Sequence, residues 1–544
     1  MATVGTAWAQ TPPDAGRLLQ DNQPTLERPT ALPPPIVAPQ QSRPASPAVA
    51  GDIRVQVSQF TFVGNAAVST AELERALAPW VGKSLNFGEL IECVESVEAR
   101  YKSAGFFLAQ AYLPPQKIRD GIIEISVSEG RLGETRLEGE SRIAPDVLYA
   151  YVDRLPRDEP LQLPQLERQV LLLNELAGGK VSLDLQAGDK AGTTDIVLVQ
   201  KEDTAANGKL EANNHGLPST GEKRMGLTLS GNSPFGRGER ISFNAMTSET
   251  RGLTSYNLRG DLPLGSAGWK VFASAARAEY SLGGAFASLK ASGQADTLRL
   301  GASYPLLRSR TANLRLQVDV DHNRLNDNFS TFSLQLGKQS RGITTTLSGD
   351  WQDDLFGPSA NRVDLALRSG KLSLGETAAQ LDAPPAGPGT AGHFAKLNLT
   401  AQRLQYLSPA FSLQMQLTGQ YADKNLDSME KFSLGGPLTL PGYASSEAVA
   451  DMGLHAKLGL RWQTLPELAI TTFTDYAEVR LLHTPLAATT RSNNKRLSDA
   501  GIAADLLLDK RFIANATVAW AGRDAPNATD NDRPRFWFSL GYLW

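Results

Sequence analysis

Few residues in this chain have the types and spacings that catalyse reactions or hold metals. The sequence has five histidines and one cysteine, Cys93, and it contains no His-Glu-x-x-His run. A structural metal site is therefore not expected, because such sites need several closely spaced His, Cys or carboxylate ligands. No Ser, His and Asp arrangement stands out among the scattered histidines, so an enzyme is the least favoured reading. We expect neither a cofactor nor a catalytic residue.

One short run imitates a nucleotide site. Gly82-Lys83-Ser84 matches the end of a phosphate-binding loop, but Leu77 stands where that loop requires its first glycine. A turn between helices is the better interpretation. The 54 basic and 57 acidic residues give a net charge of −3, so there is no basic surplus of the kind that binds nucleic acid. The function must therefore come from the architecture.

The N-terminal region reads as a leader and a tether. At 544 residues the chain is too long for one compact core and should divide into several domains. Ala7-Trp8-Ala9 has the small-x-small form of an export cleavage site, so residues 1–9 are interpreted as a residual signal-like segment. Residues 10–23 predict a short amphipathic helix, and the proline-rich residues 24–51 predict an extended linker.

Residues 52–130 predict a small α+β domain of order β-α-α-β-β. Ile53–Val63 alternates as a strand, and Ser69-Thr70-Ala71-Glu72 is a capping box that opens a helix. A second helix ends near Gly105, and strands follow at 106–112 and 122–127. The second helix is indicated by apolar residues three and four apart: Phe87, Leu90, Val94, Val97 and Tyr101.

The same element order recurs in residues 131–204. A strand at 131–137 precedes helices at 145–152 and 163–176, and strands at 181–185 and 196–199 follow. Two consecutive modules of one design indicate an internal repeat.

From residue 205 to 544 the helical period gives way to alternation. Leu314–Asp321 and Phe411–Leu417 alternate apolar and polar residues without a fault, and turn-forming clusters separate such segments. No run approaches the roughly 18 apolar residues of a transmembrane helix. Barrel strands need no such run, because they alternate lipid-facing and lumen-facing residues, and the polar face here is often charged or amide-bearing. The pattern favours a membrane barrel over a soluble β domain.

The last strand, residues 536–544, supports that reading. One of its faces is apolar and aromatic, and such a face is a liability at an exposed sheet edge but not on a closing barrel strand. The residues of that face are Phe536, Phe538, Leu540, Tyr542 and Trp544.

Several motifs resemble those of the TpsB transporters of two-partner secretion, which share a superfamily with the outer-membrane insertases. The end of the first module resembles the signature between the two POTRA domains of that family: Leu113, Pro114, Pro115, Gln116, Asp120, Gly121, Glu129, Gly130 and Arg131. Residues 434–453 resemble the loop that folds back into the pore, with its motif at Leu434, Gly435, Gly436, Pro437, Pro441, Gly442 and Tyr443. Phe473 and Asp475 resemble the barrel-wall motif that faces this loop.

Two positions depart from the family pattern. Pro441 replaces the arginine of the loop tip, and Ala477 replaces the glycine that ends the wall motif. In the family the arginine pairs with the aspartate of the wall, and proline supplies neither charge nor donor. An unpaired buried carboxylate would cost about 3–5 kcal/mol. Asp475 is therefore expected either to be hydrated in the lumen or to bond to another group.

The resemblance implies a multi-domain fold, with two α+β POTRA modules followed by a transmembrane antiparallel barrel of about 16 strands. It implies a bacterial outer-membrane location with the POTRA modules in the periplasm. It also implies ATP-independent export of an unfolded partner, a TpsA-like adhesin or haemolysin, through a pore closed at rest by the loop and by the N-terminal helix. The expected partners are that exoprotein, outer-membrane lipid and the barrel-assembly machinery, which would read the C-terminal strand as a signal. No nucleic acid is expected, and the transporter should be monomeric.

Two other transport functions fit the pattern. An insertase that assembles barrel proteins would be expected to carry more POTRA repeats, and a passive diffusion pore would use its modules only for assembly. A neighbouring gene for a very large secreted β-repeat protein would favour two-partner secretion over both.

Overall fold

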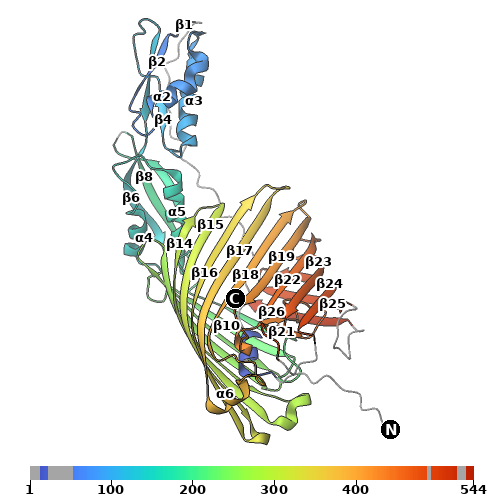
Figure 1. The fold of residues 1–544 in the computed structure, drawn as a ribbon. Coiled ribbons are helices and arrows are strands. Elements are labelled where there is room, and N and C mark those ends of the chain that lie inside the picture. Colours follow the sequence, from blue (N-terminus) through green and yellow to red (C-terminus); the bar gives the residue numbers. More distant parts are fainter. Residues whose placement is uncertain (1–12, 22–52, 191, 487–491, 523–533) are drawn as a thin grey trace.

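The computed structural model describes residues 13–21, 53–190, 192–486, 492–522 and 534–544. The signal-like segment 1–9 and the linker 24–51 lie outside the described residues. Figure 1 shows two small modules, one beyond the other, above one end of a barrel of long strands. Among the described helices, none is long and apolar enough to cross a membrane.

The first module has the predicted order with two additional short strands. Its main sheet has the order β2-β5-β4, in which β2 and β5 are parallel, and the helices cover one face. The elements are β1 Val55–Gln56, β2 Gln59–Val63, α2 Thr70–Leu77, the 3-10 helix η1 Ala78–Trp80, β3 Ser84–Leu85, α3 Phe87–Ser103, β4 Gln110–Tyr112 and β5 Ile122–Ser128.

Two strand predictions in this module were too long. The strand expected at 53–63 is broken at Val57, which exchanges backbone hydrogen bonds with Gly82 and Lys83 as the chain passes from the β1–β3 ladder into the main sheet. The strand expected from 106 begins only at Gln110, because residues 106–109 form turns that bury Phe106 edge-on against Tyr101. The capping box at Ser69 and Glu72 is confirmed.

The second module repeats this design, with the sheet order β6-β8-β7. Its helix at 145–152 is confirmed, whereas the second helix stops at Leu173 and not at 176. Both modules enclose apolar cores between helices and sheet. The elements are β6 Arg131–Glu140, α4 Pro145–Val152, α5 Leu163–Leu173, β7 Gly179–Ala187 and β8 Thr193–Glu202.

The rest of the chain forms a closed antiparallel barrel of sixteen strands, closed by pairing of the last strand with the first. The strands are β9 Ala206–Asn213, β10 Arg224–Asn232, β11 Arg240–Ser248, β12 Leu253–Leu264, β13 Trp269–Ser281, β14 Ala291–Arg308, β15 Ala312–Phe329, β16 Leu334–Asp353, β17 Ser359–Leu374, β18 Gly392–Tyr406, β19 Phe411–Ala422, β22 Met452–Gln463, β23 Leu468–Arg480, β24 Asn494–Leu508, β25 Phe512–Ala521 and β26 Arg535–Leu543.

Alternation along these strands separates an apolar outer face from a polar lumen. On β15, Val318 and Val320 are exposed outside, whereas Asp319 and Asp321, which alternate with them, are buried inside. This is the pattern expected when lipid covers one face and water or plug segments fill the other.

Short elements lie in the connections at the end of the barrel far from the modules and in its interior. The helix α1 and the small sheet of β20 and β21 lie within the barrel in Figure 1, and α6 lies at the end far from the modules. These elements are α1 Ala15–Asp21, η2 Gly284–Leu289, η3 Ser330–Phe332, α6 Glu376–Asp382, η4 Ser428–Glu430, β20 Phe432–Leu434 and β21 Ala448–Ala450.

Candidate functional site

The connection between β19 and β22, residues 423–451, turns into the barrel, and we call it the pore loop. It starts earlier than the predicted segment 434–453, and Met452 and Gly453 already belong to β22. Its apolar side chains pack against the inner wall of β23 and β24. The members of that cluster are Phe432, Leu434, Leu440, Tyr443, Ala448, Ala450, Ala477, Val479 and Leu497.

Glycines shape the turn that carries the loop inward. Gly435 and Gly436 have φ values of +107° and +87°, which side chains other than glycine rarely adopt. A Cβ on Gly435 would also lie 2.2 Å from the carbonyl oxygen of Ala444. Pro437 follows directly, and the Gly435 N–H donates to Thr439 Oγ1 at 2.9 Å. Substitution of either glycine would therefore displace the loop.

Three hydrogen bonds hold the loop tip to the wall. The Gly442 N–H donates to Asp499 Oδ2 at 2.6 Å. The Trp537 indole donates to the Pro441 carbonyl at 2.7 Å. The Tyr443 hydroxyl donates to the Ser498 carbonyl at 3.0 Å, and this side chain is buried. All three donors are uncharged.

The wall aspartate of the predicted motif has other partners. Asp475 is buried and lies 2.7 Å from His455 Nε2 and 3.4 Å from Lys457 Nζ. Lys457 in turn lies 4.1 Å from the centre of the Phe473 ring, so the two predicted wall residues share one cation. Of the two expectations for Asp475, bonding to another group is the one that the structure supports.

Sequence reasoning missed the residue that receives the loop tip. Asp499 on β24 is the direct register partner of Asp475 on β23, so both carboxyl groups project to the same place in the lumen. The alternation of residues 497–501 put Asp499 on the inner face, but no motif marked it. Only the pairing of the two strands brings it under the tip.

Charged groups fix the base of the pore loop. Lys431 pairs with Asp451, which is fully buried and also accepts the N–H groups of Leu426 and His483 at 3.1 and 2.8 Å. Arg368 on β17 lies 3.0 Å from Glu430. The base is thus held by ion pairs, whereas the tip is not.

The N-terminal helix α1 lies in the lumen against β13–β16. Asp14, just before the helix, accepts from Lys338 Nζ at 2.9 Å and from Ser428 of the pore loop at 2.6 Å. The Ala15 N–H donates to Asp327 on β15 at 2.9 Å. Ala15 and Leu18 are buried in an apolar cluster with Tyr280 and Leu325 of the wall and Met429 of the pore loop.

The helix and the pore loop touch each other. Arg17 donates to the Ser446 carbonyl at 2.9 Å. A Cβ on Gly16 would lie 2.5 Å from Ser428 Oγ and 2.8 Å from the backbone nitrogen of Met429, so only glycine allows this approach. The two segments expected to be plugs therefore form one packed unit.

The second module docks on one end of the barrel through a partly buried carboxylate. Glu175, just after α5, lies 2.6 Å from Lys270 on β13, 2.6 Å from Arg308 on β14 and 3.3 Å from Arg315 on β15. Burial by itself would raise the pKa of Glu175, but the three cations outweigh it and hold that pKa below its usual range. Nearby, Arg168 donates to the Pro305 carbonyl at 3.0 Å.

The POTRA signature residues are spread over the first module, and only Glu129, Gly130 and Arg131 stand at its junction with the second. Glu129 is buried and accepts from the Ala67 N–H at 2.6 Å and from the Tyr101 hydroxyl at 2.8 Å. The side-chain amide of Gln116 exchanges two hydrogen bonds with the backbone of Glu124, each 2.8 Å. Gly130 has φ +72°, and a Cβ there would lie 2.5 Å from Leu108 Cβ.

The other signature residues shape neighbouring turns. Leu113 packs on the first core, Pro114 and Pro115 follow β4, and Asp120 and Gly121 form a turn with positive φ; Arg131 begins β6. These contacts give the signature a structural role.

The aromatic face of the C-terminal strand lies outside the barrel. Phe536, Leu540 and Trp544 are among the exposed large side chains, while Trp537 between them is buried in the lumen. Phe538 stacks on Phe536, and Tyr542 on Trp544. Thus β26 presents its five predicted residues to the surroundings and closes the barrel against β9.

A closed sixteen-stranded barrel with an inward loop, preceded by two POTRA-like modules, defines an outer-membrane transporter of the Omp85-like fold. Residues 55–130 match the ShlB-type POTRA domain, and residues 192–492 match the family described as haemolysin secretion/activation protein ShlB/FhaC/HecB. Since that match spans more than half of the chain, the protein belongs to this family, the TpsB transporters of two-partner secretion.

Similar proteins agree with this assignment. The heme/hemopexin transporter protein HuxB of Haemophilus influenzae is 24% identical over 97% of this chain and 94% of its own length. The hemolysin transporter protein ShlB of Serratia marcescens is 23% identical over 76% of this chain and 73% of its own. The structure of CdiB from Escherichia coli is 20% identical and superposes with a TM-score of 0.72, covering 93% of this chain and 94% of that one. The protein is therefore a two-partner-secretion transporter of the outer membrane.

Proposed function

We propose that this transporter is closed at rest by one two-part plug, made of α1 and the pore loop, and that an unfolded exoprotein displaces it. The observation that carries the proposal is the direct packing of the two parts, Arg17 on Ser446 and Gly16 on Ser428, with the tip on Asp499. Such an arrangement links the stability of each part to that of the other.

Capture of the exoprotein is assigned to the POTRA modules. In the first module, the outer strands β2 and β4 of the sheet pair with no further strand among the described residues. Val63 on β2 and Tyr112 on β4 are exposed beside these edges. An extended peptide can add to such an edge through backbone hydrogen bonds, with apolar side chains selecting among sequences. An unfolded chain suits this geometry better than a folded one.

The proposed cargo is a TpsA-like adhesin or haemolysin, moved without ATP. Two relatives are named as hemolysin transporters, which makes a protein of that class the first candidate. Folding of the cargo outside the cell would give the movement its direction, because a folded chain cannot slide back. We further propose that the transporter acts as a monomer and that the barrel-assembly machinery inserts it by way of β26.

An insertase and a passive pore are the alternatives. The BamA structure from Haemophilus ducreyi superposes with a TM-score of 0.53 at 14% identity, which shows a shared fold only. The buried contacts of the plug favour regulated export over a permanently open pore.

The decisive experiment pairs the transporter with an exoprotein encoded next to it. Release of that exoprotein into the medium should require the transporter. Gly442→Pro, which removes the N–H that bonds to Asp499, should raise the conductance of the channel in the absence of the exoprotein. A photo-crosslinking amino acid at Val63 should trap the exoprotein during export, and the same probe at exposed Phe332, on the far end of the barrel, should not trap it while it is still periplasmic. Equal release without the transporter would contradict the proposal.

A further inference from the structure

The turn between β16 and β17 presents the two apolar residues Leu355 and Phe356. They are 61% and 86% exposed, and no other large hydrophobic side chain in the described residues is as exposed as Phe356. The turn lies at the same end of the barrel as the turns that contact the second module, because strands alternate in direction. It therefore faces the periplasmic side.

Hydrogen bonds from three polar side chains, which we call the polar support, hold the turn in this exposed conformation. They are Asp353, Arg403 and Gln405. Phe356 has φ +63°, a strained value for an aromatic residue. Arg403 donates to the Leu355 carbonyl at 2.6 Å, and Gln405 donates to the Phe356 carbonyl at 3.1 Å. Asp353 accepts the Leu355 N–H at 3.0 Å. Three hydrogen bonds therefore hold the backbone of this turn in place.

The support lies on the outer face of the barrel. Asn361 on β17 is the register partner of Arg403 on β18. Asn361 lies on the same face of β17 as the exposed residues Leu365 and Leu367, so Arg403 lies on the outer face too. The turn thus folds over the outside of the wall, with its carbonyls toward the support. Leu355 and Phe356 consequently point away from the lumen.

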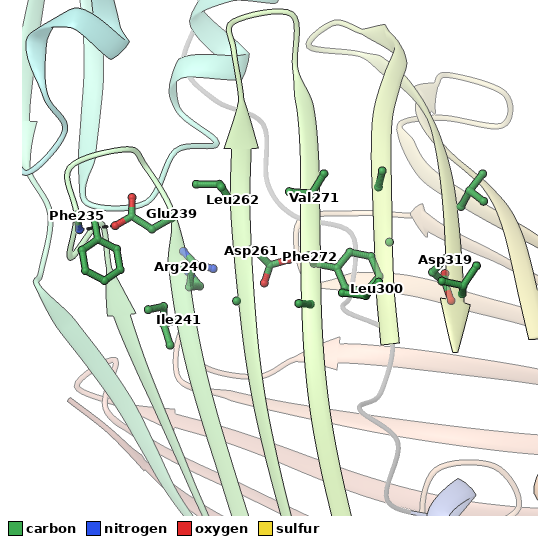
Figure 2. Close-up of a pocket in the computed structure, with 16 residues that line it drawn as sticks. Phe235, Glu239, Arg240, Ile241, Asp261, Leu262, Val271, Phe272, Leu300 and Asp319 are labelled. Carbon is green, nitrogen blue, oxygen red and sulfur yellow. Dashed lines mark hydrogen bonds between the residues drawn. The ribbon is translucent and has the colours of Figure 1, made fainter. Parts of the chain in front are cut away.

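A second turn, between β10 and β11, repeats the arrangement. Its Phe-Gly pair is Phe235-Gly236, and Phe235 is 76% exposed. Glu239, on the same face as the exposed Ile241, accepts the N–H of Phe235, drawn as a dashed line in Figure 2, and the N–H of Arg237 at 2.8 Å. In both turns a carboxylate on the outer face accepts backbone N–H groups of the turn that exposes a phenylalanine.

The Phe235 ring borders a shallow groove on the outer face. The groove has a volume of about 710 Å³, and apolar side chains such as Ile241, Leu262 and Leu300 stand along it (Figure 2). Small residues, Gly260 and Ala273, occupy its floor. An apolar groove on the outside of an outer-membrane barrel faces hydrocarbon, so Phe235 lies where the rim meets lipid.

We propose that these two Phe-Gly turns are anchors that insert into the headgroup and acyl boundary of the periplasmic leaflet. Aromatic side chains favour this layer of a bilayer. The turns are six strands apart around the ring of sixteen, so together they fix both the depth and the tilt of the barrel. The partner of this surface is phospholipid.

The anchor at Phe235 is continuous with the docked module. The Gly236 carbonyl accepts from the Ala144 N–H at 2.9 Å, and Arg237 lies 2.6 Å from Asp146. One side of this turn therefore contacts the second POTRA module while the other meets lipid. The anchor sets the height of the module above the membrane.

Spin-label accessibility tests the proposal on the full-length protein. Phe356→Cys and Phe235→Cys are labelled and reconstituted in vesicles of phosphatidylethanolamine and phosphatidylglycerol. Oxygen, which partitions into lipid, and a water-soluble nickel chelate serve as relaxation probes. Native Cys93 is fully buried, and burial raises the pKa of its thiol to about 11, so it does not compete for the label. Leu300→Cys on the outer face provides the lipid reference, and Phe332→Cys on η3 provides the water reference.

At both anchors the oxygen-to-nickel accessibility ratio should be several-fold above that of Phe332→Cys and below that of Leu300→Cys, as a position at the headgroup and acyl boundary requires. A ratio equal to that of Phe332→Cys would overturn the proposal. A label shielded from nickel only when an exoprotein is present would also overturn it, because the turn would then bind cargo. Heat-modifiable gel mobility reports assembly of each variant, and Leu355→Cys reads the same turn if Phe356→Cys fails to assemble.

Discussion

The two places where a separate part of the chain is fastened to the barrel differ in kind. The second POTRA module docks through Glu175, a partly buried carboxylate held by three cations. The tip of the pore loop is held by three hydrogen bonds from uncharged donors, to Asp499 and to the Pro441 and Ser498 carbonyls. Removing Glu175 breaks three charge-assisted hydrogen bonds at once, which costs more than losing one hydrogen bond from an uncharged donor. We therefore expect the contact at Glu175 to persist and the contact at the loop tip to be released more easily.

The largest effect is expected at the dock. Glu175→Gln leaves the partly exposed Lys270, Arg308 and Arg315 without their shared carboxylate and should weaken docking by about 1.5–3 kcal/mol. Distances between spin labels on the second module and on the barrel should spread over a broader range. The exposed Glu159→Gln is the matched control and should keep the narrow distribution. A narrow distribution in both variants would mean that Glu175 is not what fastens the module.

The next effect is expected at the contact of helix and loop. Gly16→Val places a side chain where a Cβ already lies 2.8 Å from the Met429 nitrogen. Overpacking of this kind costs about 1–3 kcal/mol, and it should release both parts of the plug. Planar-bilayer recordings should show longer open times. Gly260→Val, at a position where a Cβ meets nothing within 4 Å, is the control; unchanged open times in Gly16→Val would refute the joint plug.

A smaller change is expected at the tip. Asp499→Ala removes the acceptor of the Gly442 N–H, at a cost of about 1–3 kcal/mol, whereas Asp499→Asn keeps an acceptor oxygen. The alanine variant should open more often than the asparagine variant in the same recordings. Asp505→Ala controls for loss of a lumen carboxylate, because Asp505 pairs with Arg461 of the wall. Equal opening of the two Asp499 variants would show that the tip does not depend on this bond.

The smallest effect is expected when pH is changed near neutrality, and it concerns the contact of Glu175 with its three cations. The pKa of Glu175 is lowered below the ordinary value of 4.5, so its contribution is complete above that value and is lost as pH falls through the folded-state pKa. Docking should be constant from about pH 8 to pH 5 and weaken in more acidic solution. The label distances used for Glu175→Gln measure this. Weakening on the alkaline side would contradict the sign.

The fold could be predicted because its local signals agree with its tertiary structure. The capping box at Ser69 begins α2, and the fault-free alternation around Leu314 becomes β15. The errors came from tertiary effects: Val57 leaves its strand because its backbone bonds to Gly82 and Lys83, which lie far along the chain. A propensity pattern carries no information about such partners.

The site was predicted less completely for the same reason. Motifs located the pore loop and Asp475, since both lie in continuous runs of sequence. Asp499 gained its role from strand register, and Glu175 from the docking of one domain on another, so neither had a local signature. His455 was passed over because a single histidine on an alternating strand suggests nothing until its neighbour Asp475 is placed beside it.

The ion pairs at the base of the pore loop set the manner in which the channel can open. With Lys431 paired with Asp451 and Arg368 with Glu430, the tip of the pore loop can move while its base stays attached. Opening is then a hinged movement of a tethered stopper. Under the proposed function, a tethered stopper can return to its seat by a short intramolecular movement once the cargo has left, and no other protein is needed to reseal the membrane.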